Sequence, residues 1–309
     1  MHLSVVTTMY NSAAHLAEFH ERTSRAARQL DEDYELIFVN DGSPDDSIEV
    51  ALALREHDDH VKVIDLSRNF GHHKAIMTGL SHAGGERVFL IDCDLEEDPG
   101  WLVDFETVMG ETGADVVYGV QDGRKGGLLE RMSGTLFYRL FNFLSSYPVP
   151  ANVVTARLMS HRYVASLVEH RDREVFLLGL WTITGFRQVP VVVRKHSRGD
   201  TSYTLTRKLS ILVNSVTSFS NKPLVYIFYL GCFISLFAAL AACYLVVRRL
   251  FFGELLSGWP SIMVSIWLLG GLTIFSLGVI GIYLSRVFSE TKQRPYTVIR
   301  EIHERKKQP

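Results

Sequence analysis

Cysteine is scarce in this sequence, and neither sign of charge is in clear excess. The 309 residues include three cysteines, Cys93, Cys232 and Cys243, and the last two lie within an apolar run. So few thiols, placed in this way, argue against a disulfide framework and favour a reducing compartment. The formal net charge is −2, whereas nucleic-acid-binding domains carry a basic surface. We therefore expect no nucleic acid among the partners.

The sequence also lacks internal repeats, low-complexity stretches and a secretory signal at its start. It opens with His2-Leu3-Ser4-Val5-Val6, a pattern typical of a β-strand. A secretory signal would instead show a basic segment followed by an apolar one. We therefore expect the N-terminal part of the chain to stay in the cytoplasm.

Charged residues are almost missing between Val225 and Leu284. Two apolar segments lie there, at about 225–247 and 261–284, and each exceeds the roughly 20 residues that cross a bilayer core. The connection between them is short, which predicts a transmembrane hairpin whose outer ends face the same side. A buried helix pair in a soluble core is the alternative.

Basic residues on both flanks indicate which side that is. From Arg286 onward, seven basic residues stand against three acidic ones, a local balance of +4. Arg207, Lys208 and Lys222 precede the hairpin, and cytoplasmic flanks of membrane helices are rich in such residues. Two arginines in the connection oppose this orientation but are fewer. We expect the outer ends in the cytoplasm.

Four parts of the chain follow from this pattern. A cytoplasmic α/β domain is expected over 1–205 and a juxtamembrane amphipathic helix over 206–224. The hairpin covers 225–285, and a basic cytoplasmic tail covers 286–309. The juxtamembrane helix has apolar residues at helical spacing on one face, so it either lies in the membrane interface or packs on the soluble domain. Both arrangements stay open.

Strand-like and helix-like segments alternate through the first part of the chain, which predicts a parallel sheet with helices on both faces. Ligands bind at the carboxyl ends of the strands in such sheets. The predicted strands are Leu3–Thr8, Tyr34–Asn40, Val61–Leu66 and Arg87–Asp92, and the predicted helices are 12–30, 44–57 and 72–83.

Two carboxylates close the fourth strand. Asp92 and Asp94 flank Cys93 directly after the apolar residues Leu90 and Ile91. Hard oxygen ligands of this kind suit Mg²⁺ or Mn²⁺, which bind through a few carboxylates and the phosphates of a substrate. Alone, such a pair is a weak signal. Its position at a strand end strengthens the prediction of a metal site.

The first two strands also end in polar groups. Asp41 closes the second strand, Gly42 permits the turn, and Ser43 is expected to cap a helix that begins at Pro44. Tyr10 follows the first strand and suits stacking on a nucleotide base. Three strand ends with nucleotide-compatible groups indicate a nucleotide site, although the second end is also explained by a helix start alone.

Together these segments resemble the family 2 inverting glycosyltransferases with a glycosyltransferase-A (Rossmann-like) fold. More narrowly, the chain is similar to the polyprenyl-phosphate glycosyltransferases, which include dolichol-phosphate mannose synthase and bactoprenol glucosyltransferases. The resemblance covers essentially the whole chain. It rests on the segments 7–12, 40–43, 67–75, 92–94, 124–138 and 219–224.

The resemblance implies roles for individual residues. Donor binding falls to Thr8, Tyr10, Asn11, Asp41, Lys74, Asp92, Arg198 and Ser202. Metal binding, of Mg²⁺ or Mn²⁺, falls to Asp92, Asp94 and Glu96, where Glu96 stands in place of the usual glutamine. The acceptor phosphate is held by Arg124, Arg131, Ser133 and Thr135, because arginines orient phosphates through paired hydrogen bonds. The residues expected to carry catalysis are Asp92, Asp94 and Arg131.

Two positions depart from the family pattern. Thr155 stands where relatives often have an aspartate proposed as a base on the acceptor side, and Leu178 stands where they often have an arginine. The first change is compatible with activity, because a lipid phosphate with a second pKa of about 6 is largely ionised near neutrality. The acceptor pocket is expected to differ from that of the commonest members.

The expected activity is transfer of one sugar from a nucleotide-diphosphate sugar, with UDP preferred, to polyprenyl (undecaprenyl) phosphate with inversion. The expected place is the cytoplasmic face of a bacterial inner membrane, in a multi-pass protein that contacts the bilayer and serves cell-surface glycan or lipid modification. A homo-oligomer is plausible. The alternatives are a processive polysaccharide synthase, which would carry a Gln-x-x-Arg-Trp segment and more membrane helices, and a catalytically silent membrane scaffold. The sequence does not identify the sugar.

Overall fold

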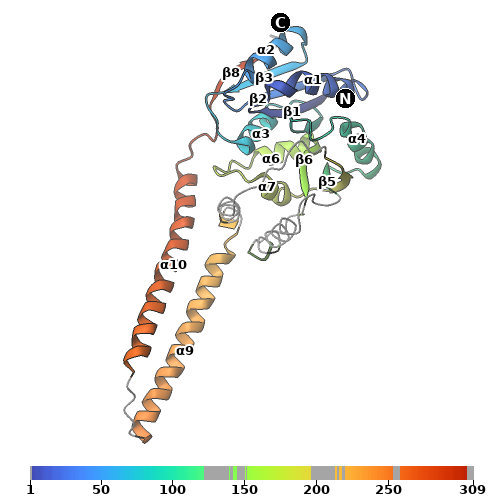
Figure 1. Cartoon of the computed structure of the whole chain (residues 1–309). Helices are drawn as coiled ribbons and strands as arrows, with labels where there is room; N and C mark the ends of the chain where they lie inside the picture. Colours follow the sequence, from blue (N-terminus) through green and yellow to red (C-terminus); the bar gives the residue numbers. More distant parts are fainter. Residues whose placement is uncertain are drawn as a thin grey trace. The chain divides into compact units, whose positions relative to one another are not determined.

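In the computed structural model the chain forms two compact units (Figure 1). The first unit holds the sheet and includes the residues after 293, while the second holds the two long apolar helices. The residues that the structure describes are 2–121, 139, 142–144, 150, 152–195, 213, 216–217, 220–252 and 258–304.

The strands of the described residues form one 8-stranded sheet in the order β7-β5-β6-β4-β1-β2-β3-β8. Pairing is parallel from β4 through β1 and β2 to β3, whereas β6 is antiparallel to both β4 and β5. The strands are β1 (Leu3–Met9), β2 (Tyr34–Asn40), β3 (Val61–Leu66), β4 (Arg87–Leu90), β5 (Val116–Gln121), β6 (Val153–Ser160), β7 (Gln188–Val193) and β8 (Ile299–His303).

Helices cover both faces of this sheet, as the strand–helix alternation predicts. On one face α1 contacts α2 and α4, whereas on the other α3 contacts α6 (Figure 1). The close fit of α3 to the sheet requires Gly79, because a Cβ there would lie 2.5 Å from a Val6 methyl group and 2.9 Å from one of Val39. The helices of this unit are α1 (Ala13–Arg28), α2 (Ser47–His57), α3 (His72–Ser81), α4 (Trp101–Thr112), α6 (His161–Val168) and α7 (Leu177–Ile183).

The central strand β1 shows why the prediction of a parallel sheet succeeds. All seven of its residues are buried, as expected for a strand covered on both faces. Its register pairs Met9 with Asn40 of β2 and Val6 with Leu90 of β4. The carboxyl ends of the three strands therefore meet at one edge of the sheet, where Thr8, Asp41 and Asp92 lie.

The second helix begins later than the sequence predicts. Ser43 is not its cap: α2 starts at Ser47, with Asp46 in the N-cap position. The Ser43 hydroxyl instead donates to Asp45 and accepts from the backbone N–H of Asn11. Asp45 also accepts from the Ser47 hydroxyl and from the backbone N–H of Ala13. The hydrogen bonds to the Asp45 carboxylate hold this segment as a turn, so the helix begins at Ser47 and not at Pro44.

Residues after the apolar segments return to the sheet, which the sequence did not predict. Strand β8 pairs antiparallel with β3 at the edge of the sheet. Arg300 donates to Asp65 at 2.9 Å, and Asp65 also accepts from Asn40 at 2.8 Å. Lys62 forms an ion pair with Glu304 at 3.0 Å. Part of the predicted basic tail is therefore a component of the α/β domain.

The second unit contains α9 (Lys222–Phe252) and α10 (Trp259–Thr291), which contact each other. Among the described residues, these two helices are long and apolar enough to cross a membrane, over Lys222–Ala241 and Ser265–Thr291. Their apolar side chains are largely exposed, as with Phe233 at 68% and Trp267 at 76%. The helix pair fits the predicted hairpin. Most of the predicted juxtamembrane helix lies outside the described residues.

Candidate active site

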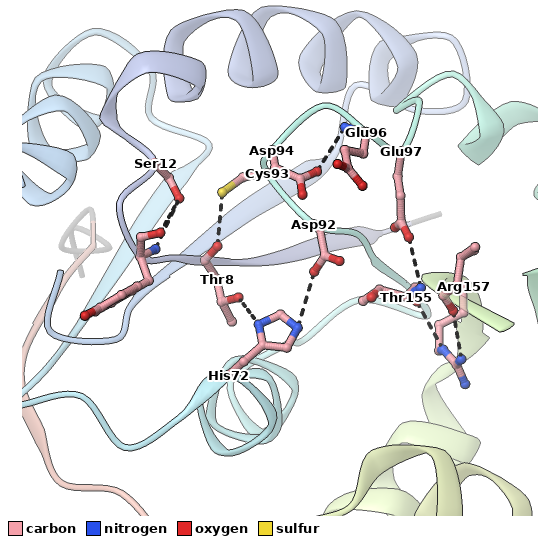
Figure 2. A network of polar contacts seen from close by, with 12 residues as sticks. Thr8, Ser12, His72, Asp92, Cys93, Asp94, Glu96, Glu97, Thr155 and Arg157 are labelled. Atoms are coloured by element: carbon pink, nitrogen blue, oxygen red, sulfur yellow. Dashed lines mark hydrogen bonds and ion pairs between the residues drawn. The ribbon is translucent and has the colours of Figure 1, made fainter. Parts of the chain in front are cut away.

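The loop after β4 carries the predicted acidic pair. Asp94 is exposed, and its carboxylate accepts a hydrogen bond from the backbone N–H of Glu96 at 2.9 Å. Between the two aspartates, the buried Cys93 thiol donates to the carbonyl of Thr8 at 3.1 Å. Leu95 has a φ of 61°, a conformation that is uncommon outside glycine. The loop is thus tied to β1 through its middle residue, with an aspartate on either side (Figure 2).

His72 connects the first strand to this acidic loop. Figure 2 shows its ring between Thr8 and Asp92: Nδ1 lies 3.0 Å from the Thr8 hydroxyl, and Nε2 lies 3.5 Å from the Asp92 carboxylate. Burial lowers the His72 pKa, although the nearby carboxylates oppose this. The side chain remains 49% exposed, so it holds the two strand ends together while facing solvent.

Glu97 forms a buried charged centre directly behind the acidic pair. Its side chain is 0% exposed and lies 2.9 Å from the Lys195 ammonium. One carboxylate oxygen also accepts from the backbone N–H of Thr155 at 3.0 Å, whereas the other has no hydrogen-bond partner among the described residues. Burial raises the Glu97 pKa, and the Glu97 carboxylate in turn raises the Lys195 pKa against the effect of burial. The 2.9 Å separation favours the charged pair.

Strand β6 contributes the other side of this centre. Arg157 is 1% exposed and donates to the carbonyls of Val154 and Thr155, and its guanidinium lies over the Trp181 ring. Figure 2 shows Glu97 and Arg157 on either side of Thr155. A buried guanidinium therefore faces the same region as the buried carboxylate, and each reduces the cost of burying the other.

The electrostatics of Asp92 follow from these neighbours. The Asp92 pKa is raised to about 6, because burial and the charges of Asp94 and Glu96 together outweigh the lowering by a hydrogen bond from Thr155 and by the charge of Lys195. Lys195 also lies 4.0 Å from the Glu96 carboxylate. An added cation beside Asp92 and Asp94 would relieve this accumulation of negative charge.

Asp41 lies at the same edge, but backbone groups occupy its carboxylate. It accepts from Phe70 N–H at 2.7 Å and from Gly71 N–H at 3.0 Å, and the residue is 3% exposed. Gly42, with a φ of 61°, allows the chain to pass so close to Arg68 that a Cβ would lie 2.5 Å from its carbonyl carbon. Asp41 thus fixes the turn that begins α3, and each oxygen keeps a further lone pair for a ligand.

Three further residues predicted to bind the donor follow strands or begin a helix at this edge. Tyr10 is 50% exposed, and Asn11 follows it with a φ of 55°. Lys74 lies in the first turn of α3. Six predicted residues lie outside the described part of the chain, and their roles stay predictions: Arg124, Arg131, Ser133, Thr135, Arg198 and Ser202.

Sequence reasoning missed the two members of the buried ion pair. Glu97 stands in an acidic run with Glu96 and Asp98, and the sequence pattern predicted no role for it. Lys195 follows β7, far away in the sequence. The sequence does contain a signal for Glu97. The apolar residues Leu95 and Pro99 stand two positions before and after it, and both are buried. The spacing therefore turns this one acidic side chain inward.

Comparison with known proteins agrees with this architecture. The family model described as glycosyl transferase family 2 matches residues 4–167. A protein of Mycobacterium tuberculosis (strain CDC 1551 / Oshkosh), whose name places it among the glycosyltransferases, is 54% identical over 98% of this chain and 89% of its own. The prophage bactoprenol glucosyl transferase homolog of Escherichia coli (strain K12) is 30% identical over 98% of this chain and 99% of its own.

The bactoprenol glucosyl transferase of Shigella phage SfV is also 30% identical, over 97% of this chain and 98% of its own. The α/β core followed by two apolar helices is the glycosyltransferase-A-like architecture that the sequence predicts. Since the family model matches more than half of the residues and the relatives align over nearly all of them, this chain belongs to glycosyl transferase family 2.

Proposed function

We propose that this glycosyltransferase moves one sugar from a nucleotide-diphosphate sugar, by preference a UDP-sugar, to polyprenyl phosphate. The observation that carries the proposal is the placement of Thr8, Asp41, Asp92 and Asp94 at one edge of the sheet, in a chain that also has two apolar helices. Bactoprenol in the names of two relatives that align over nearly all of this chain supports a polyprenyl acceptor.

The donor set fits a divalent cation, Mg²⁺ or Mn²⁺. Among the described residues, no group of three or more acidic, histidine or cysteine side chains is arranged as a ready-made metal cage. Such a cage is not required, because Mg²⁺ is usually bound by one or two carboxylates together with substrate phosphates. Asp92 and Asp94 supply that number, and Glu96 could add a third oxygen. A bound divalent cation would neutralise charge on the departing diphosphate.

The acceptor reacts through an oxygen of its own phosphate. This oxygen forms a bond to the anomeric carbon as the bond from that carbon to the diphosphate breaks, so the configuration inverts and a nucleoside diphosphate leaves. A phosphate with a second pKa of about 6 needs little help in losing a proton. Thr155 is therefore adequate in place of an acidic residue, and its hydroxyl contributes by holding Asp92 in position.

The described residues would then orient and neutralise rather than form covalent bonds. Asp41 holds the turn before α3, and His72 fixes Asp92 relative to β1. The Lys195–Glu97 pair places a positive charge behind the acidic loop. Preorganised charge of this kind lowers the barrier because it needs no rearrangement during reaction.

Membrane insertion of α9 and α10 would tether the sheet domain to the bilayer that holds the lipid acceptor. We propose a multi-pass protein of a bacterial inner membrane with the sheet domain in the cytoplasm, and the basic residues on both flanks support that orientation. The domain boundaries at 205, 224 and 285 belong to this proposal.

Transfer assays on membranes test the proposal. Membranes that contain the chain are incubated with undecaprenyl phosphate and a panel of radiolabelled nucleotide sugars, and product is measured in the lipid phase. We expect one donor to label the lipid, and Asp92→Ala to reduce labelling on the order of 10²-fold or more. Glu111→Ala, an exposed acidic residue of α4, is the control for charge. Absence of lipid labelling with every donor, or full activity of Asp92→Ala, would contradict the proposal.

A further inference from the structure

A cavity lies in the α/β domain, away from the acidic loop. Its volume is about 500 Å³, within the range of small-ligand sites. It is lined by the last turns of α3, by residues after α6 and by the segment that leads into β8. We call it the Tyr296 pocket, after one of its lining residues. Its polar lining includes Thr78, Ser81, His82, Arg171, Arg173 and Tyr296.

The lining of the Tyr296 pocket is suited to an anion. It contains two arginines, a histidine and several hydroxyl groups, and none of its described lining residues is acidic. Burial raises the Tyr296 pKa, and the positive charges of Arg171 and Arg173 oppose that rise. Both guanidinium groups therefore act on the region of the Tyr296 hydroxyl.

Hydrogen bonds hold the walls of the pocket together. The hydroxyl groups of Thr78 and Thr297 lie 2.8 Å apart and join α3 to the segment before β8. Ser81 donates to the carbonyl of Thr78 at 2.7 Å, and Nδ1 of His82 lies 2.8 Å from the same carbonyl. The polar groups that α3 contributes to the lining are thus held in place by the fold.

The pocket is separate from the candidate active site. His72, which contacts Asp92, begins α3, whereas Ser81 ends it. The helix has 10 residues, which corresponds to roughly 15 Å. The last part of the lining, from Pro295 onward, comes soon after α10 ends at Thr291.

We propose that the Tyr296 pocket binds a phosphate-bearing anion, either the head group of an acidic phospholipid or a free phosphate compound. Arginine recognises phosphate through paired hydrogen bonds and keeps its charge at every physiological pH. The lipid source rests on the proposed membrane insertion of α10, because only then is a head group present where the lining segment leaves that helix. The free source does not depend on it.

Binding measurements on the full-length protein in detergent micelles test this proposal. Native mass spectrometry measures retention of phosphatidylglycerol against phosphatidylcholine, and thermal stabilisation measures binding of inorganic phosphate. In Arg171→Ala/Arg173→Ala we expect binding to weaken roughly tenfold or more for each lost charge-assisted contact. The control is Arg28→Ala/Arg187→Ala, which removes two exposed arginines elsewhere in the domain. Arg171→Ala alone, at the more exposed position, serves if the double variant does not fold.

Each outcome of these measurements either supports or overturns the proposed anion site. Selective loss of phosphatidylglycerol supports the lipid source, loss of phosphate binding alone supports the free source, and loss of both supports a site that accepts either. The proposal is overturned if the wild type binds neither probe or if the arginine variant binds both as the control does. Since no turnover is needed, these results do not depend on sugar transfer, which is measured separately on the same preparations.

Discussion

Replacing Lys195 with methionine removes the ammonium group that faces Glu97 and keeps a side chain of similar length. Glu97 is 0% exposed and lies 2.9 Å from that ammonium. In the variant, its carboxylate would stay buried with the Thr155 backbone N–H as its remaining hydrogen-bond donor among the described residues. The charges of Arg157 and Glu97 also attract each other.

The magnitude follows from the geometry. Two unit charges 2.9 Å apart attract by about 6 kcal/mol at an effective dielectric constant of 20, before desolvation is subtracted. Removing one partner of a buried ion pair costs about 3–5 kcal/mol, and we expect the lower end because Arg157 offsets part of the loss. For a domain of this size, 3 kcal/mol corresponds to a fall in melting temperature of roughly 6–12 °C.

A double-mutant cycle separates this effect from general damage to packing. Wild type, Lys195→Met, Glu97→Gln and the double variant are compared by thermal unfolding in the same detergent. The double variant removes both charges, so it should be more stable than Lys195→Met alone, with a coupling of about 2 kcal/mol. An unchanged melting temperature in Lys195→Met, or losses that simply add in the double variant, would refute the reasoning.

Three further predictions concern Asp41, Asp45 and Arg300. Asp41→Ala leaves two backbone N–H groups without their acceptor, so it should lower the free energy of unfolding by about 2 kcal/mol or more and weaken UDP binding in a titration. Asp41→Asn keeps one acceptor, so its stability and its UDP affinity should lie between those of the wild type and Asp41→Ala. Wild-type values in Asp41→Ala would contradict this role. Hydrogen bonds from Ser43 and Ser47 outweigh burial and lower the Asp45 pKa from 3.8 to about 2, so its stabilisation of about 2 kcal/mol is present above pH ~4 and is lost as the pH falls toward 2. Acid unfolding should show that Asp45→Asn is less stable than wild type near pH 6 and that the difference shrinks toward pH 2; a constant difference would exclude this linkage. Arg300 is 61% exposed, so Arg300→Ala should cost only about 1 kcal/mol or less yet speed hydrogen exchange in β8 while β1 stays protected, and equal exchange in β8 would count against the ion pair as a tie for this strand.

Much of the fold could be predicted because burial leaves a direct pattern in the sequence. The bounds of β2 and β3 agree with those predicted, since each strand is rich in buried β-branched, aromatic and aliphatic residues and is bordered by polar ones. The start of α2 was wrong by about three residues. Ser43 and Pro44 look like a helix start, but Asp45 collects hydrogen bonds from both sides of the turn and delays it.

Features that depend on distant parts of the chain could not be predicted in this way. The pairing of Arg300 with Asp65 spans 235 residues, and β8 places the charged residues Arg300 and Glu301 between two isoleucines, which breaks the alternation typical of a strand. In the site, Asp92, Asp94, Asp41 and Thr8 lie at the predicted edge. Glu97 is buried beside Lys195, which follows β7 and is far away in the sequence.

Strand β8 also makes the order of synthesis matter for folding. The apolar helices interrupt the sheet domain, which resumes only at Arg294. The ribosome therefore synthesises β8, which pairs with β3, after the two apolar helices. Until then the edge of β3 is open, and an open strand edge is a template for unwanted pairing. A soluble version cut before Lys222 would keep that edge exposed permanently. A version that keeps β8 and replaces the two apolar helices with a flexible linker would instead let this strand close the sheet.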